Sequence, residues 1–138
     1  MFLTTPEQTF AYFNRLMDPE VEEFWVAALA ANRRVIKRRC LFRGTVDQCL
    51  FHPRDVIRFA CMSNASSLLV AHNHPTGDPT PSREDHEVTE RLFAACELVQ
   101  IALVDHVIVG RPTFFSFWQS GALARIRDLG EPSDQSLG

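Results

Sequence analysis

The stretch from Ser67 to Asp85 constrains the fold more than any other part of the chain. It opens with an apolar run, residues 67–71, whose length and composition are typical of a short buried strand. The loop that follows holds one glycine and three prolines, and such a stiff loop can return the chain toward the end of the strand. From Ser82 onward a helical pattern places apolar side chains on one face: Val88, Leu92, Ala95 and Val99. We therefore expect a strand and a helix that meet across a short turn.

Two histidines stand where this strand ends, and an aspartate stands where the helix begins. Residues two apart in an extended segment point the same way, so His72 and His74 can direct both imidazoles at one point. Two neutral imidazoles and the Asp85 carboxylate suit a zinc ion and leave a fourth position for water, as in catalytic zinc sites. The alternative is an ordinary turn and helix start, with Ser82 as the N-cap. The two interpretations are compatible, because Ser82 can cap the helix while its hydroxyl faces the loop.

The spacing of these residues carries a family resemblance. The pattern His72-x-His74-Pro75, six residues, Ser82-x-x-Asp85 resembles the metal motif of the JAB/MPN-plus (JAMM) metalloprotease superfamily. The longer stretch 71–110 is similar to the RadC branch of that superfamily, and the resemblance extends over about residues 22–121. Longer RadC proteins carry an N-terminal helix-hairpin-helix segment, and only about twenty residues precede the core here, so we expect a short form without it.

This resemblance implies the chemistry of the site. It implies a Zn2+ ion held by the residues that match His72, His74 and Asp85. It also implies a serine, here Ser82, that helps to stabilise the transition state, and an upstream glutamate that acts on zinc-bound water. The fold that it implies is a deaminase-like αβα layered sandwich.

The identity of that glutamate is open between two neighbours. Residues 24–29 are apolar on both faces and predict an interior strand, with Glu22 and Glu23 just ahead of it. The RadC pattern places a glutamate two residues before the phenylalanine that opens this strand, which favours Glu22. Glu23 is the rival, because strand alternation lets only one of the two face the site. Acids that flank a buried strand are also commonly just solvated.

The remaining elements predict a layered α/β protein with a mixed, mostly antiparallel sheet. The expected order is helix, strand, strand, helix, strand, helix, strand, strand. The second strand, residues 35–42, carries three consecutive basic residues, so one of its faces is wet or it lies at a sheet edge. In the strand 101–109, Asp105 and His106 interrupt an apolar run. We interpret them as a structural hydrogen-bonded pair, with a supporting role near the metal as the alternative. His52 and His86 are not expected to bind metal.

Length and composition set the wider frame. The 138 residues predict an N-terminal docking helix in 1–19, a RadC-like JAB/MPN domain in 20–129 and a disordered tail in 130–138. A net charge of −3 gives no general basic footprint for nucleic acid, and no apolar run is long enough to span a membrane. Four cysteines without CxxC spacing suggest reduced, buried thiols and a cytoplasmic protein: Cys40, Cys49, Cys61 and Cys96.

These observations favour a zinc-dependent hydrolase of the metallopeptidase or isopeptidase type, which would act on an amide bond of a protein or peptide. One alternative is a metal-dependent nuclease associated with DNA repair, a label that RadC proteins carry, although the charge of the chain does not support nucleic-acid binding. Another is a partner-binding module that keeps zinc without turnover. The substrate and the oligomeric state do not follow from the sequence.

Overall fold

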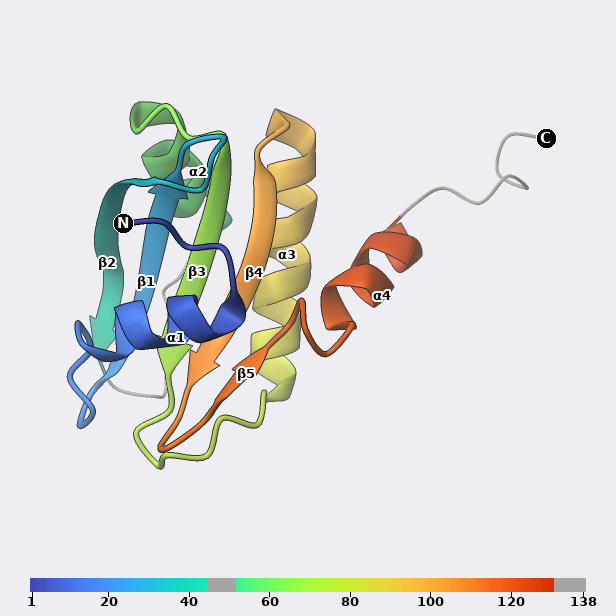
Figure 1. Ribbon diagram of the computed structural model, residues 1–138. Helices are drawn as coiled ribbons and strands as arrows, with labels where there is room; N and C mark the ends of the chain where they lie inside the picture. Colours follow the sequence, from blue (N-terminus) through green and yellow to red (C-terminus); the bar gives the residue numbers. More distant parts are fainter. Residues whose placement is uncertain (45–51, 131–138) are drawn as a thin grey trace.

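A five-stranded sheet forms the centre of the protein (Figure 1). The computed structural model describes residues 1–44 and 52–130. Their strands are β1 (Glu22–Leu29), β2 (Val35–Gly44), β3 (Ser67–Asn73), β4 (Ala102–Val109) and β5 (Phe114–Ser116). Their helices are α1 (Pro6–Asn14), α2 (Pro53–Met62), α3 (Arg83–Val99) and α4 (Ala122–Gly130).

The sheet is mixed and mostly antiparallel, as predicted. Its strand order is β2-β1-β3-β4-β5, and β3 with β4 is the parallel pair, while the other neighbouring pairs are antiparallel. Helix α1 lies across the front of the sheet in Figure 1, and α2 and α3 lie behind it. The layered α/β sandwich expected from the element order is therefore confirmed. The predicted division into an N-terminal helix and a domain stays a prediction.

Strand alternation divides the core into two layers. On β1, Phe24, Val26 and Ala28 face α2 and α3, whereas Ala27 and Leu29 face α1. All seven residues of β3 are buried, which is expected of a central strand covered on both faces. The sheet face on which a residue lies thus decides which helix its side chain meets.

Because β3 and β4 are parallel, the C-terminal ends of both strands lie at the same end of the sheet. Helix α3 makes the crossover between these strands, as parallel neighbours require. Its first turn therefore lies next to the loop that leaves β3, at the lower edge of the sheet in Figure 1. This edge collects the polar residues that the sequence singled out.

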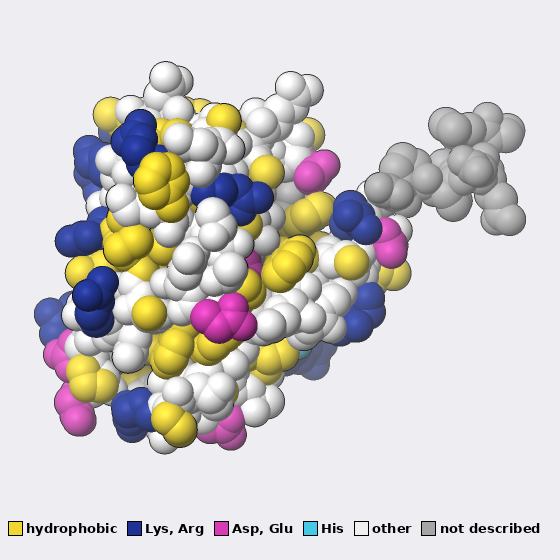
Figure 2. Space-filling model, viewed as in Figure 1, with side chains coloured by type: hydrophobic (Ala, Val, Ile, Leu, Met, Phe, Trp, Pro, Cys, Tyr) yellow, Lys and Arg dark blue, Asp and Glu magenta, His cyan; other side chains and the backbone are white. Residues whose placement is uncertain are grey.

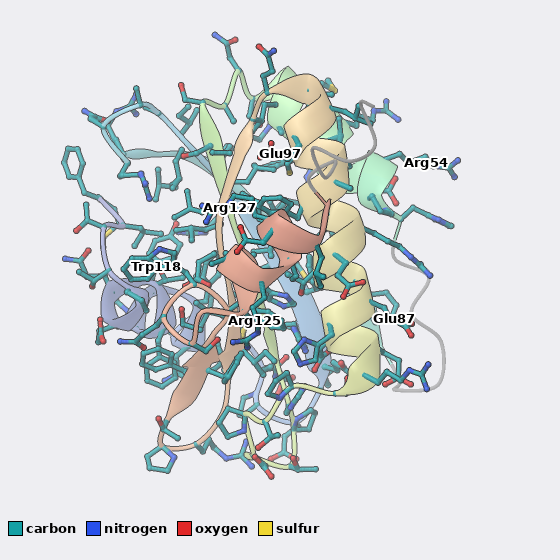
Figure 3. The ribbon with its side chains drawn as sticks, turned by 90° about the vertical axis from the view of Figure 1, so that its right-hand side faces the viewer. Arg54, Glu87, Glu97, Trp118, Arg125 and Arg127 are labelled. Carbon is teal, nitrogen blue, oxygen red and sulfur yellow. The ribbon has the colours of Figure 1, made fainter. Side chains whose placement is uncertain are left out.

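Several details differ from the sequence-based expectations. Helix α4 was not predicted, and it packs beside α3 with only Ala122 and Leu123 buried (Figure 3). Cys40, Cys61 and Cys96 are free thiols, but Cys61 is exposed and Cys40 only partly buried, so the expectation of buried thiols holds for Cys96. Cys49 and the predicted tail beyond Gly130 lie outside the described residues.

Basic side chains gather along the edge strand. The three consecutive basic residues of β2, at positions 37–39, are all exposed, and dark blue side chains line this side of the molecule in Figure 2. The sequence left open whether this strand has a wet face or lies at a sheet edge, and both statements hold in the structure. No helix in the described ranges is long and apolar enough to cross a membrane, and the cytoplasmic location stays a prediction.

Asp105 is a buried carboxyl on the α1 side of β4. Only 3% of the residue is exposed, and its oxygens accept hydrogen bonds from the backbone N–H groups of His106 and Trp118 and from the Ser116 hydroxyl. Burial raises the pKa of Asp105 to about 6, although these hydrogen bonds oppose the shift. The folded state therefore holds a proton here at pH values where the unfolded chain, with an aspartate pKa near 3.8, has released it.

We predict that Asp105→Asn flattens the pH dependence of stability between about pH 4 and pH 6. In the wild type, the free energy of unfolding falls as the pH rises through this window, because the raised pKa means that folding binds a proton at Asp105. This fall amounts to up to about 3 kcal/mol and should be absent in the variant. Urea unfolding at several pH values measures this difference. Asp128→Asn, at an exposed site, is the control and should keep the wild-type slope. An Asp105→Asn protein with the wild-type slope would contradict the prediction.

Candidate metal centre

Three ligand atoms converge where β3 ends and α3 begins. His72 Nε2 lies 3.1 Å from His74 Nε2 and 3.0 Å from Asp85 Oδ1, and His74 Nε2 lies 3.1 Å from Asp85 Oδ2. The two histidines share one side of the extended chain, and the crossover brings the first turn of α3 to that side. The structure therefore brings together the three residues that the sequence predicted as ligands.

The ligand atoms of His72, His74 and Asp85 form a triangle, here called the ligand triangle, whose size suits a small cation. Zinc binds histidine nitrogen and carboxylate oxygen at about 2.0–2.1 Å, so tetrahedral ligand atoms lie about 3.4 Å from one another. The observed separations are a few tenths of an ångström shorter, and a small outward shift of the side chains would admit the ion. Within the described residues, His72, His74 and Asp85 are the group found to be close enough to hold a metal.

The Nδ1 atoms of His72 and His74 each have a partner that fixes the orientation of the ring. His74 Nδ1 lies 2.8 Å from the backbone oxygen of Asp78, which only accepts, so Nδ1 carries a proton and Nε2 is left for a metal. His72 Nδ1 lies 2.8 Å from Nε2 of His106. Partners of this kind orient metal-binding histidines in many proteins.

The contacts of His106 refine one expectation. The sequence favoured Asp105 and His106 as a structural hydrogen-bonded pair, and the backbone N–H of His106 does donate to the Asp105 carboxylate at 2.7 Å. These side chains lie on opposite faces of β4, because the residues are consecutive in a strand. From His106, Asp105 accepts the backbone N–H and not the ring, while the His106 ring reaches His72 behind the candidate metal centre. The alternative, a supporting position near the metal, matches the geometry.

Asp85 belongs to both the metal centre and the cap of α3. Its backbone N–H donates to the Ser82 hydroxyl oxygen at 3.0 Å, and its Oδ2 accepts the backbone N–H of Ser82 at 2.8 Å, which completes a capping box. Burial of the carboxyl opposes its ionisation, but the neighbouring imidazoles of His72 and His74 outweigh this effect and hold the pKa of Asp85 below its usual range. The cap and the site are one structure, as the sequence allowed.

The register of the sheet separates the two candidate glutamates. Phe24 pairs with His72 across β1 and β3, and Glu22 lies two residues earlier on the same face, beside the site. The hydrogen bond with Asp85 is the main cause of the raised pKa of His74, and the negative charge of Glu22 adds to it. Glu22 is half-buried, with its charge close enough to influence a ligand.

Glu23 lies on the opposite face and already has partners. Its Oε1 accepts the Trp25 indole N–H at 3.0 Å and the backbone N–H of Asp18 at 3.2 Å, and its Oε2 pairs with the Arg43 guanidinium at 3.2 Å. The residue is 5% exposed. Glu23 therefore ties the start of β1 to its neighbours and points away from the metal ligands.

Asn73, between the two histidines, holds the segment that carries Glu22. Its side chain points to the other face of the sheet, where Oδ1 accepts the backbone N–H of Glu23 at 2.7 Å. Its amide group donates to the carbonyl oxygens of Asp18 and Val21 at 3.0 and 2.9 Å. Sequence reasoning did not single out this residue, although a buried amide between two ligands was a signal that it needs partners.

The loop between β3 and α3 is held against the β4–β5 turn. A side chain at Gly110 would place its Cβ 2.6 Å from the carbonyl oxygen of Gly77, so the two backbones approach more closely than any other residue allows. The Arg111 guanidinium donates to the carbonyl oxygen of Pro75 at 2.9 Å. The backbone N–H of Arg111 donates to the carbonyl oxygen of Gly77 at 2.8 Å. The first part of this loop, which follows His74 directly, is thus anchored to the β4–β5 turn.

His52 and His86 lie away from the three candidate ligands. The His86 ring packs on Phe117, with 5.1 Å between ring centroids. His52 is exposed before the first turn of α2. Ser82 is exposed at the site, and because its oxygen accepts from Asp85, its own proton can be donated elsewhere.

Comparison with known proteins identifies the family of this chain. Residues 3–122 match the RadC-like JAB domain family. Proteins named UPF0758 in Thermotoga maritima and Haemophilus ducreyi are 46% and 41% identical over 121 and 116 residues, or 88% and 83% of this chain. These alignments cover 54% and 52% of the relatives, so the chain spans about half the length of these proteins. The match over most of the chain shows that the protein belongs to the RadC-like JAB domain family.

Proposed function

We propose that this protein is a zinc-dependent hydrolase that cleaves an amide bond of a protein or peptide. Family membership supports a metal-dependent hydrolase of the JAMM type at the level of the superfamily. The observation that carries the proposal is the convergence of two imidazole nitrogens and one carboxylate on a single point, with a glutamate and a serine beside them. The nature of the bond, the metal and the substrate are our proposals.

The donor set favours zinc. His72, His74 and Asp85 offer two nitrogens and one oxygen, and three such ligands leave one position of a tetrahedron open. When bound there, zinc would act as a Lewis acid that makes water a stronger nucleophile near neutral pH and polarises a carbonyl group. Manganese or iron could use the same ligands, so metal analysis is part of the test.

Glu22 is our candidate for the general base. Its carboxylate lies on the same face of the sheet as both imidazoles and can take a proton from the attacking water and pass it to the leaving amine. Its neighbour Glu23 is engaged by a guanidinium and an indole and has no path to this face. The Asn73 contacts keep the backbone at Glu22 in place, so proton transfer would start from a fixed position.

Ser82 is our candidate for stabilising the negative charge that forms on the substrate oxygen. Its hydroxyl oxygen is occupied by the N–H of Asp85, which leaves the hydroxyl proton to donate toward the site. A donor that is already oriented stabilises such an oxyanion without a cost of rearrangement. The same contact joins Ser82 to a metal ligand and sets their relative positions.

We predict that the purified protein holds about one zinc per chain and that His74→Ala removes it. The variant loses one of three ligands, and metal binding at pH 7 depends on all of them. His86→Ala is the matched control, because this histidine packs on Phe117 outside the ligand triangle and should keep the metal. Elemental analysis of protein prepared without chelator gives the result. A metal-free wild type, or full zinc content in His74→Ala, would count against the site.

We predict that Glu22→Gln lowers hydrolysis by roughly 10²- to 10⁴-fold and leaves the zinc content unchanged. The variant keeps the shape of the side chain and loses only the group that accepts the proton. The assay uses mixed libraries of fluorescence-quenched peptides and isopeptide-linked peptides, with product formation followed over time.

Glu23→Gln is the paired control. It should keep zinc and most activity, and it should lower the unfolding temperature because Arg43 loses its buried partner. If Glu23→Gln loses activity and Glu22→Gln keeps it, Glu23 and not Glu22 is the general base. Cutting of plasmid DNA that depends on His74, without peptide cleavage, would favour a nuclease. Absence of any turnover by a zinc-loaded wild type would favour a binding module.

A further inference from the structure

Two fully buried polar side chains lie behind the metal centre without a role in the mechanism above. Thr89, on the inner face of α3, and His106, in β4, are both 0% exposed. The His106 ring stacks on Phe117 with 4.9 Å between centroids and meets the edge of Phe24 at 5.8 Å. Burial of such groups among aromatic rings is unfavourable unless each polar atom has a partner.

Every polar atom of these two side chains does have a partner. Thr89 Oγ1 lies 2.7 Å from the Asp85 carbonyl oxygen and 2.6 Å from His106 Nδ1, and His106 Nε2 lies 2.8 Å from His72 Nδ1. The contacts form an unbroken chain from the backbone of one metal ligand to the ring of another. It crosses α3, β4 and β3.

The direction of each hydrogen bond follows from the first one. A carbonyl oxygen only accepts, so the single hydroxyl proton of Thr89 points at Asp85. The Thr89 oxygen must then accept from His106, which places a proton on Nδ1 of that ring. No carboxylate in the described part of the chain contacts the His106 ring, and its aromatic surroundings favour the neutral form. A neutral ring with its proton on Nδ1 has an accepting Nε2, so His72 must donate from its own Nδ1.

We propose that Thr89 and His106 are positioning residues that fix the proton of His72 on Nδ1 and so keep its Nε2 lone pair directed at the metal. This inference rests on the metal centre proposed above. The order of protons starts at the Asp85 carbonyl and ends at the His72 ring, so the same aspartate supplies a ligand and sets the tautomer of a second ligand. Neither residue touches the metal or a substrate.

The chain offers a matched set of variants for this idea. Thr89→Val keeps the shape of the side chain and removes the hydroxyl, whereas Thr89→Ser keeps the hydroxyl. Thr9→Val is the control, because Thr9 is also buried in a helix and donates to the carbonyl four residues earlier, at Thr5, but belongs to α1 on the other face of the sheet. All variants are prepared as the full chain.

The first measurement is the affinity for Co²⁺, followed by its visible absorption in competition with a chelator. Without the Thr89 hydroxyl, the proton on His106 Nδ1 has no acceptor. The preference of His72 for the tautomer that can bind metal then weakens. We expect Thr89→Val to bind cobalt about 10- to 100-fold more weakly than wild type, as is typical when an outer partner of a ligand is lost. Thr89→Ser and Thr9→Val should bind as wild type does. Equal affinity in wild type and Thr89→Val would overturn the proposal.

The second measurement reads the tautomers directly and needs no metal. In protein labelled with ¹⁵N-histidine, two-bond NMR correlations show which nitrogen of His106 carries the proton. We expect Nδ1 in wild type and in Thr89→Ser. A proton on Nε2, or on both nitrogens, would overturn the inference whether or not metal binds. A wild type with the expected His106 tautomer that takes up no cobalt would instead overturn the proposed function. If Thr89 has only a structural role, Thr89→Val will lower the stability of the protein and leave the proton of His106 on Nδ1. That result would also overturn the inference.

Discussion

The two-residue period of an extended strand decides where each polar group near the site can point. Within His72-Asn73-His74, alternation sends the two imidazoles toward α3 and the amide between them toward the loop before β1. The same rule on β1 sends Glu22 toward the imidazoles and Glu23 away from them. A single inserted residue in β3 would exchange the two faces and remove both histidines from the site. The fold therefore fixes the chemistry of this edge through register.

Pairing of β3 and β4 as parallel neighbours adds the second constraint. The crossover helix between them must begin where β3 ends, so Asp85 reaches the histidines from the first turn of α3. The helix start also needs a cap, and the Ser82–Asp85 capping box provides it with two of the residues proposed for the site. Stability of the helix end and arrangement of the ligands thus depend on the same contacts.

The sequence predicted that His72, His74 and Asp85 come together, because the signals for this cluster are local. His72 and His74 follow an apolar run at a spacing of two, and Asp85 follows a cap residue at a spacing of three. The choice between Glu22 and Glu23 could not be made from alternation alone, since its phase depends on which residue of β1 faces His72. Only the register with β3 provides that information.

The contacts that sequence reasoning missed join residues far apart in the chain. Thr89 gives no sign of its role beyond being polar on an apolar helix face, and its partner His106 is seventeen residues away. Asp105 and His106 are joined through a backbone N–H and not through the His106 ring, because consecutive strand residues face opposite layers. Helix α4 was not predicted, and only two of its side chains, Ala122 and Leu123, are buried.

The anchoring of the ligand groups has a consequence for how an ion would be captured. The imidazoles of His72 and His74 and the carboxylate of Asp85 are each held by neighbours that belong to the folded chain. Their loss of conformational entropy is therefore incurred during folding, before any ion arrives. Capture of an ion then requires only its partial dehydration and a small expansion of the triangle, so little of the binding free energy is spent on ordering the protein.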